Sequence, residues 1–298
     1  MNPNNLSSQP RPVGSYAEAL TRIETLQAKD PPDIRSVCRP QLMTHGMKVE
    51  KAIIFLHGYT NCPEQFRGLG EIFYNLGYNV LIPCFPHHGL QDRLTAHQAR
   101  LTAEELVAVA DEVVDIAHGL GSHITLVGLS CGGVMTGWAA QHRADLDEAV
   151  LISPAFGLHV IPAPLTSWAM RLAMLLPNFF RWWDPKLQAE LGPEHSYPWF
   201  STRGLANVLR LGQAVLATAR YSKPAARSIL VVTNANDVAV SNHAAAELVS
   251  HWRKQGAEQL HTYEFAAELN LGHDLIDPGQ ADQRTDIVYP KLVELITT

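Results

Sequence analysis

The sequence predicts an α/β fold in which a mostly parallel sheet is flanked by helices, and three observations lead to this prediction. Short apolar runs alternate with segments of helical periodicity along most of the 298 residues. One run ends in a Gly-x-Ser-x-Gly pattern at residues 128–132, and a helix-like segment follows it. The alternation is interrupted once, by about 75 residues between Ile152 and Ser228, which is far more than one crossover helix needs.

The individual elements follow from local patterns. Residues 16–28 are expected to form a short amphipathic helix, and Pro63 suits the first position of the next one. Thr102 and Glu105 form a capping box before a helix with one apolar face, made of Leu106, Val109, Val113 and Ile116. The expected strands are the apolar runs at 52–56, 79–82, 124–127, 149–152, 228–233 and 259–265.

The Gly-x-Ser-x-Gly pattern is expected to form a nucleophile elbow around Ser130. The turn from strand to helix is so tight that bulky side chains do not fit two positions before or after the serine. Gly128 and Gly132 meet this requirement. The turn lifts the Ser130 hydroxyl above the sheet edge, and the N–H groups that follow face the place where an oxyanion would form. Ser130 is therefore the candidate nucleophile.

A serine nucleophile requires a base and an acid that orients the base, and in such folds the acid precedes the histidine in the chain. Asp237 lies on a loop after an apolar strand, and His273 lies in the loop after the last expected strand. They are the preferred acid and base. Asp274 is a poor alternative acid because adjacent side chains rarely face each other, and Asp277 and Glu268 are weaker alternatives.

The apolar strand at 52–56 leads directly into His57, Gly58 and Tyr59. The loop after this strand is expected to supply a second backbone N–H to the developing negative charge. Tyr59 and Cys131 are therefore the candidate donors of an oxyanion hole. Gly58 lets the chain pass close to the substrate, and His57 is expected to hold the loop by hydrogen bonding rather than to act as a second base.

Together these motifs resemble the α/β-hydrolase superfamily. Leu-His-Gly-Tyr-Thr at 56–60 is similar to the Leu-His-Gly-aromatic-Thr of carboxylesterases and monoacylglycerol-lipase-like proteins. Pro-Cys-Phe-Pro-His-His-Gly at 83–89 resembles their Pro-x-x-Pro-Gly-His-Gly loop, except that His87 stands where glycine is usual. The resemblance spans residues 38–157 and 226–298, and it implies the α/β-hydrolase fold and a serine hydrolase with a catalytic triad.

Three parts are expected along the chain: a tail and short helix at 1–35, a core at 36–154 plus 224–298, and a mainly helical cap or lid at 155–223. The cap is rich in prolines, at 162, 164, 177, 185, 193 and 198, and in large apolar side chains. These side chains are Trp168, Trp182, Trp183, Trp199, Phe179, Phe180, Phe200, Met170 and Met174. Most are expected to pack the cap onto the core, and two or three to offer an apolar wall to an acyl chain.

Composition restricts the partners. A net charge of −6 without a long basic run argues against nucleic acid. The N-terminus lacks the charged and apolar regions of a signal peptide, and no run of about 18 apolar residues could span a bilayer. Residues 165–176 could rest on a membrane surface as an amphipathic helix, although they lack a basic face. We expect a cytoplasmic protein whose oligomeric state the sequence does not determine.

Cysteine and histidine usage indicates no metal or cofactor. Cys38, Cys62, Cys84 and Cys131 lack metal-ligand spacing, and in a cytoplasmic protein they are expected to be reduced. Cys131 is expected to be a small packing residue. Among the fourteen histidines, the neighbouring pair at 87–88 has no zinc-binding pattern around it, and no nucleotide-binding motif is present.

These residues predict two-step acyl transfer to Ser130 from a carboxylic ester, with no cofactor. Short to medium acyl esters or monoacylglycerols are the expected substrates. Thioester or amide hydrolysis, C–C bond cleavage, and ligand binding without catalysis remain open alternatives on the same scaffold. Haloalkane dehalogenases and epoxide hydrolases are disfavoured because they carry a carboxylate in place of Ser130.

Overall fold

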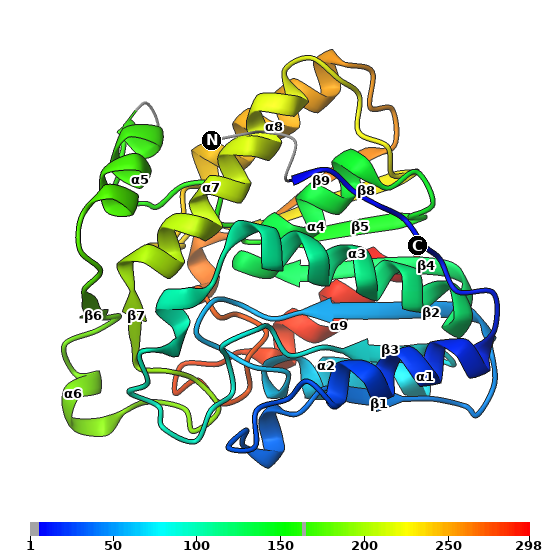
Figure 1. The fold of residues 1–298 in the computed structure, drawn as a ribbon. Helices are drawn as coiled ribbons and strands as arrows, with labels where there is room; N and C mark the ends of the chain where they lie inside the picture. The colour runs from blue at the N-terminus through cyan, green and yellow to red at the C-terminus, as the bar shows by residue number, and fades with distance from the viewer. Residues whose placement is uncertain (1–5, 163–164) are drawn as a thin grey trace.

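The computed structural model describes residues 6–162 and 165–298 (Figure 1). The first five residues of the expected tail, and Pro164 of the cap, lie outside these ranges. Within them, the protein is a three-layer α/β structure in which helices cover both faces of one large sheet (Figure 1).

Seven strands of the described ranges form this sheet, in the order β1-β3-β2-β4-β5-β8-β9. The first strand is antiparallel to its neighbour and all the other pairs are parallel. The fold is thus the predicted α/β-hydrolase architecture. The strands are β1 Gln41–Met43, β2 Val49–Leu56, β3 Asn79–Ile82, β4 Gly121–Leu129, β5 Glu148–Ile152, β8 Ser228–Asn234 and β9 Leu260–Phe265.

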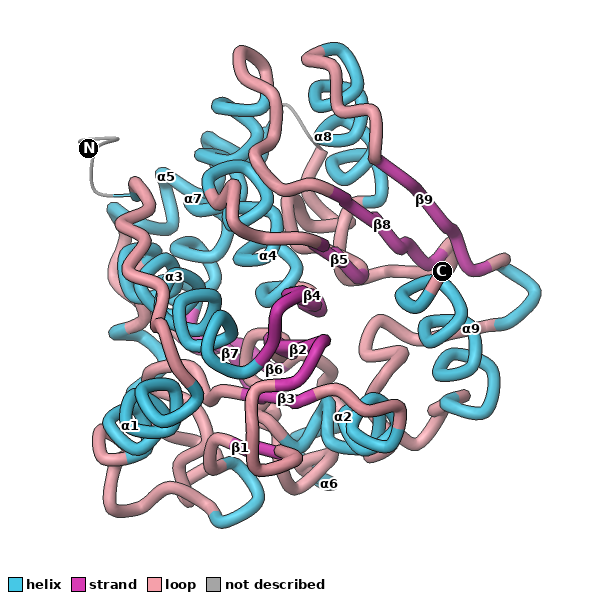
Figure 2. Tube along the Cα trace, turned by 90° about the vertical axis from the view of Figure 1, so that its right-hand side faces the viewer, coloured by secondary structure: helices cyan, strands magenta, loops and turns pink. Residues whose placement is uncertain are grey.

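The helices divide between the two faces of the sheet. Figure 2 shows α2 and α9 on one side of the twisted strands, and α3 and α4 on the other. Apolar side chains of α1, α3, α4, α7 and α8 share one core cluster, and those of α2 and α9 share a second. The helices are α1 Tyr16–Gln27, α2 Glu64–Asn75, α3 Ala103–Leu120, α4 Cys131–His142, α5 Thr166–Leu175, α6 Leu187–Glu190, α7 Thr202–Ala219, α8 Asn242–Lys254 and α9 Thr285–Thr297.

Strand β2 shows how the sequence builds both cores. Ala52, Ile54 and Leu56 belong to the cluster on one face, while Ile53 and Phe55 belong to the cluster on the other. Successive side chains of a strand point to opposite faces, so a continuous apolar run fills both sides of a buried sheet. All five side chains are fully buried.

Local signals in the sequence correspond closely to the observed boundaries. Thr102 and Glu105 form the expected capping box: the Thr102 hydroxyl accepts the Glu105 N–H, and the Glu105 carboxylate accepts the Thr102 N–H. Helix α2 begins at Glu64, so Pro63 is its N-cap rather than its first residue as predicted. Either position suits proline, which has no backbone N–H, because no N–H donor is needed there.

The insertion between β5 and β8 contains more than helices. Besides α5, α6 and α7, it holds a two-stranded antiparallel sheet of β6 Phe180–Trp182 and β7 Trp199–Ser201. Leu205, Val208, Leu211 and Val215 of α7 are part of the large core cluster, so this helix also packs as a core element. In the described part of the chain, no helix combines the length and apolarity needed to cross a bilayer.

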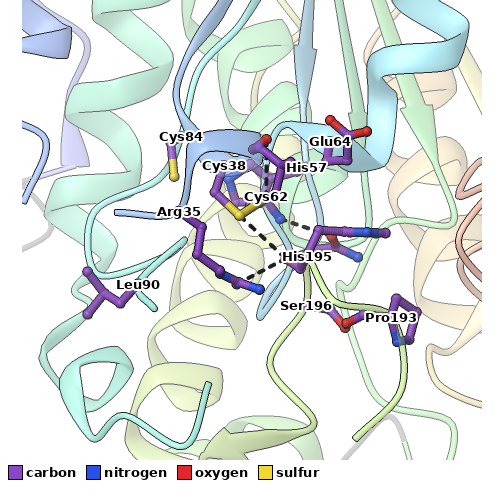
Figure 3. Close-up of a disulfide and its surroundings, with 12 residues drawn as sticks. Arg35, Cys38, His57, Cys62, Glu64, Cys84, Leu90, Pro193, His195 and Ser196 are labelled. Atoms are coloured by element: carbon purple, nitrogen blue, oxygen red, sulfur yellow. Dashed lines mark hydrogen bonds between the residues drawn. A yellow bond between two sulfur atoms is a disulfide. The ribbon is translucent and has the colours of Figure 1, made fainter. Parts of the chain in front are cut away.

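Two of the four cysteines are paired in the structure, contrary to the sequence-based prediction that all are reduced. Cys38 and Cys62 form a disulfide with a Cα–Cα distance of 5.2 Å, so the prediction of four reduced cysteines is wrong for this pair (Figure 3). Both are fully buried and pack with Ile34 in a small separate cluster. The bond joins a short 3-10 helix, Ser36–Cys38, to the start of α2. Cys84 and Cys131 are free, and Cys131 is buried.

The elbow at Ser130 depends on close backbone contacts. Ser130 itself has φ 56° and ψ −110°, a conformation that is strained for any residue other than glycine. A Cβ atom on Gly128 would lie 2.1 Å from the carbonyl oxygen of Gly132, and one on Gly132 would lie 1.9 Å from that of Leu56. Only glycine fits at both positions.

Replacing Gly132 by alanine should therefore destabilise the protein by at least about 3 kcal/mol, because the added methyl group overlaps backbone that cannot move aside. Urea unfolding of the variant measures this loss. Gly14→Ala is a matched control, since its added Cβ would meet only the Glu18 carboxylate at 3.9 Å. A Gly132→Ala protein as stable as the control would contradict the contact.

Candidate active site

The expected nucleophile, acid and base all lie at the carboxyl edge of the sheet. Ser130 follows β4, Asp237 follows β8 and His273 lies in the loop after β9. The structure joins the last two: His273 Nδ1 and Asp237 Oδ2 are 2.7 Å apart. Asp237 Oδ1 accepts the backbone N–H groups of Ala239 and Val240, which holds the carboxylate in place.

This pair shifts both protonation equilibria toward the charged forms. Burial by itself raises the pKa of Asp237, but the bond from His273 and the two backbone N–H groups outweigh burial and hold that pKa below its ordinary value. Burial lowers the pKa of His273, whereas the hydrogen bond to Asp237 and the charges of Asp237 and Asp274 raise it, and the net direction is upward. Asp237 therefore stabilises an imidazolium at His273.

The three alternative acids have other surroundings. Asp277 Oδ2 lies 2.9 Å from His195 Nε2, and Asp274 Oδ1 accepts a hydrogen bond from Gln65. Glu268 is exposed on a short 3-10 helix, Ala267–Leu269. Asp237 is the only one of the four that bonds the His273 ring among the described residues.

Ser130 is held through its backbone. Its N–H donates to the Ile152 carbonyl at 3.0 Å, and its carbonyl accepts from Val134 and Ala155. The residue is almost fully buried, with 9% of its surface exposed. Its hydroxyl makes no hydrogen bond to His273 within the described chain. A catalytic bond of this kind often forms only once substrate is present.

The loop at 57–62, which we call the oxyanion loop, runs beside the serine. An ideal Cβ on Gly58 would be 3.8 Å from Ser130 Cβ, so the loop backbone lies against Ser130. The peptide between His57 and Gly58 is bonded at both ends: its carbonyl accepts the Gly132 N–H at 3.2 Å, and its N–H donates to Gln65 Oε1 at 2.8 Å. The elbow and this loop are thus fixed to each other.

The next peptide determines where the Tyr59 N–H points. The Gly58 carbonyl accepts from the Asn61 N–H at 3.2 Å and lies 2.9 Å from His57 Nδ1. Because N–H and C=O point in opposite directions in a trans peptide, the Tyr59 N–H faces away from these partners. Neither this N–H nor that of Cys131, at the start of α4, donates to another residue in the described ranges.

Two buried histidines support the oxyanion loop. His57 Nε2 accepts the Phe85 N–H, so its Nδ1 carries the proton and donates to Gly58. In the same way, His88 Nε2 accepts the Thr60 N–H while its Nδ1 donates to Pro86. Burial lowers the pKa of His57 well below its ordinary value and that of His88 to about 4. Both rings therefore act as neutral hydrogen-bonding groups near pH 7.

The insertion also contacts this loop. Trp183 Nε1 donates to Thr60 Oγ1 at 2.8 Å, and the Tyr197 N–H donates to the Thr60 carbonyl at 2.7 Å. The Tyr59 hydroxyl donates to the Ser201 carbonyl. Of the four tryptophans in the insertion, Trp183 is thus the one that bonds the oxyanion loop, in the part of the chain that the structure describes.

Comparison with known proteins assigns the chain to a family. The family model described as serine aminopeptidase, S33, matches residues 47–269, about three quarters of the chain. The chain belongs to this family. It is an α/β hydrolase similar to lipases and esterases.

Individual relatives resemble this chain less in sequence than in fold. A thermostable monoacylglycerol lipase of Bacillus sp. (strain H-257) is 29% identical over 124 residues, which is 38% of this chain and 44% of that protein. The match therefore spans less than half the length of the curated relative.

A monoacylglycerol lipase of Paleococcus ferrophilus superimposes with a TM-score of 0.65 at 18% identity, over 86% of this chain and 97% of that chain. A soluble variant of monoglyceride lipase from Saccharomyces cerevisiae gives 0.64 at 15% identity, over 86% and 90%.

In this α/β hydrolase, the histidine at position 87 of the 83–89 loop has an unusual backbone conformation. His87 has φ 67°, the left-handed region that favours glycine. Histidine therefore occupies a backbone conformation at this position that is strained for a residue with a Cβ atom. The His87 ring Nε2 lies 3.2 Å from Glu105 Oε1.

Several supporting residues are not identified by the sequence motifs. Gln65 is fully buried on α2, His88 was considered only as half of a possible metal pair, and Trp183 was one of several cap aromatics. Nothing local distinguishes them, because each acts through a partner far away in the chain. No group of three or more His, Cys, Asp or Glu side chains in residues 6–162 and 165–298 is arranged to hold a metal ion.

Proposed function

We propose that this α/β hydrolase is a serine hydrolase that cleaves carboxylic esters through an acyl-enzyme intermediate. The observation that carries the proposal is the 2.7 Å bond between His273 and Asp237, at the same sheet edge as the strained Ser130 elbow. An imidazole oriented by a buried carboxylate next to an elbow serine is the arrangement that serine nucleophiles use.

The proposed reaction has two steps. Because Nδ1 of His273 bonds Asp237, its Nε2 is free to take the Ser130 proton as the hydroxyl attacks the ester carbonyl. The imidazolium then gives that proton to the departing alcohol. Water attacks the acyl-enzyme in the same way, with His273 again as base, and releases the acid and the free serine.

The oxyanion is proposed to sit between the N–H groups of Tyr59 and Cys131. Both donors lack a partner among the described residues, and both belong to backbone that is fixed before substrate arrives. Preorganised donors of this kind stabilise negative charge as it develops, and each commonly contributes about 10²- to 10³-fold in rate.

The proposed substrates are short to medium acyl esters or monoacylglycerols, with the insertion at 155–223 acting as a cap. Three relatives are named as lipases of monoacylglycerols. The insertion also places aromatic side chains next to the oxyanion loop: Trp183 packs against Phe200, with ring centroids 4.2 Å apart, and meets Tyr59 edge-on. An aromatic wall there favours apolar acyl groups.

Ser130→Ala should abolish ester hydrolysis while leaving the fold intact, since removal of a nucleophile costs about 10⁴-fold or more in kcat. Hydrolysis of p-nitrophenyl butyrate by wild type and variant, together with labelling by a fluorophosphonate probe, tests this. A folded variant that keeps more than about a tenth of wild-type activity rules the nucleophile out. A wild type that neither hydrolyses the ester nor takes up the probe indicates a ligand-binding protein instead.

Asp237→Asn should lower kcat by about 10³- to 10⁴-fold, because His273 loses the partner that orients its ring. Asp237 also raises the pKa of His273, and only the neutral ring accepts a proton. The residual activity of the variant should therefore persist to lower pH, which a pH profile of kcat/KM measures. Asp277→Asn, whose carboxylate bonds His195 instead, is the control. A severe loss there and a mild one at Asp237 would reverse the assignment.

Trp183→Ala should lower kcat/KM for medium-chain esters more than for acetate esters, because each CH₂ that leaves an apolar wall loses about 0.8 kcal/mol. Measuring kcat/KM over a series of acyl lengths for wild type, Trp183→Ala and Trp168→Ala tests this. Trp168→Ala is the control, since 64% of that side chain is exposed on α5. If the two variants give the same acyl profile as wild type, Trp183 does not contribute to the acyl site.

A further inference from the structure

Gln65 is a buried amide that bonds two separate loops of the proposed active site. It lies in the first turn of α2 and is fully buried. Its Oε1 accepts the Gly58 N–H at 2.8 Å, and its Nε2 donates to Asp274 Oδ1 at 3.0 Å. A buried amide is costly unless its donors and acceptors are paired, and both ends of this one are.

The oxygen end acts on the oxyanion loop. The Gly58 N–H that it accepts belongs to the same peptide whose carbonyl accepts the Gly132 N–H of the elbow. Gln65 and Gly132 thus hold opposite ends of one peptide plane. The next peptide carries the Tyr59 N–H, so a rotation of the first plane would turn this donor as well.

The nitrogen end acts on the loop that carries His273. Asp274 is the next residue in the chain, and the charged groups around it are His273, Asp277 and Asp237. Gln280 also donates to its Oδ2, at 3.4 Å. Burial is the main influence on Asp274 and raises its pKa, while the Gln65 donor favours the ionised form. The Gln65 bond therefore stabilises a carboxylate in an unfavourable environment.

We propose that Gln65 is a positioning residue for the reaction: its single side-chain amide ties the oxyanion loop to the His273 loop and so keeps the oxyanion donors and the base in register. This inference rests on the proposed ester hydrolysis. The two loops are distant in sequence, since Gln65 and Asp274 are 209 residues apart. A second and longer contact joins the same loops, from Asn61 Nδ2 to Asp277 Oδ2 at 3.5 Å. The link through Gln65 consists of hydrogen bonds whose polarity can be reversed, which separates a positioning role from simple filling of space.

Reversal of this polarity is the test. Gln65→Glu keeps the acceptor for Gly58 but places a second carboxylate against Asp274, and adding Asp274→Asn restores a donor–acceptor pair of opposite direction. The readouts are the rate of Ser130 labelling by a fluorophosphonate probe and kcat and KM for p-nitrophenyl butyrate, between pH 5.5 and 8. Unfolding midpoints establish that each variant is folded.

Gln65→Glu should slow labelling and lower kcat by about 30-fold at pH 8 with little change in KM, because two carboxylates then compete in a buried site. The deficit should shrink toward pH 5.5, where the pair shares a proton. The double variant should recover to within about threefold of wild type at every pH. Gln65→Met, which loses both bonds, should show a deficit that does not depend on pH, and it serves as the second variant where Gln65→Glu does not fold.

Gln280→Met is the matched control, because Gln280 donates to Asp274 at 3.4 Å and to Asp277 at 3.1 Å without touching the oxyanion loop itself. It should stay within about threefold of wild type. A folded double variant that labels no faster than Gln65→Glu overturns the proposal. A wild type that takes up the probe but hydrolyses no ester contradicts the proposed function alone, and the rescue of labelling still decides the role of Gln65.

Discussion

The structure depends on the close approach of the first turn of α4 to the end of β2. The Gly132 backbone lies so near Leu56 that a single methyl group on it would overlap the Leu56 carbonyl, and its N–H bonds the His57 carbonyl. Ser130, two residues before this contact, has its strained conformation at the same tight turn, and the Cys131 backbone lies between the two. The proposed nucleophile and oxyanion donors are therefore parts of one unit, and the strain at Ser130 is sustained by the packing around it.

The oxyanion loop in turn is held from several sides. Gln65 bonds it from α2, His57 and His88 bond it to the loop after β3, and Trp183 bonds it from the insertion. The two imidazoles can serve in this way because burial keeps them neutral, so each ring offers one donor and one acceptor. His57 was expected from the sequence to hold this loop by hydrogen bonding, and its ring bonds Gly58 and Phe85, while the His88 ring bonds Thr60 and Pro86.

The disulfide extends this support to the N-terminal part of the chain. Cys62 is the last residue of the oxyanion loop, and its bond to Cys38 ties the loop to the segment before β1 (Figure 3). The carbonyl of His195, from the insertion, lies 3.7 Å from Cys38 Sγ and also accepts from Arg35. The expectation of reduced cysteines followed from an inferred compartment and from spacing. Pairing depends instead on which side chains meet in space, and a sequence separation of 24 gave no signal of it.

The sequence by itself determined the features that depend on neighbouring residues. Apolar runs specify buried strands, the Thr102 capping box starts α3, and glycines on either side of Ser130 specify the elbow, because sterics and local hydrogen bonds act over a few residues. The order of residues along the chain also favoured Asp237 as the partner of His273, and the structure joins the two. Only the tertiary structure decided which other distant groups meet, such as Gln65 on Asp274 and Cys38 on Cys62. Such pairs are determined by how whole helices and strands pack together, and the spacing of residues along the chain does not predict this packing.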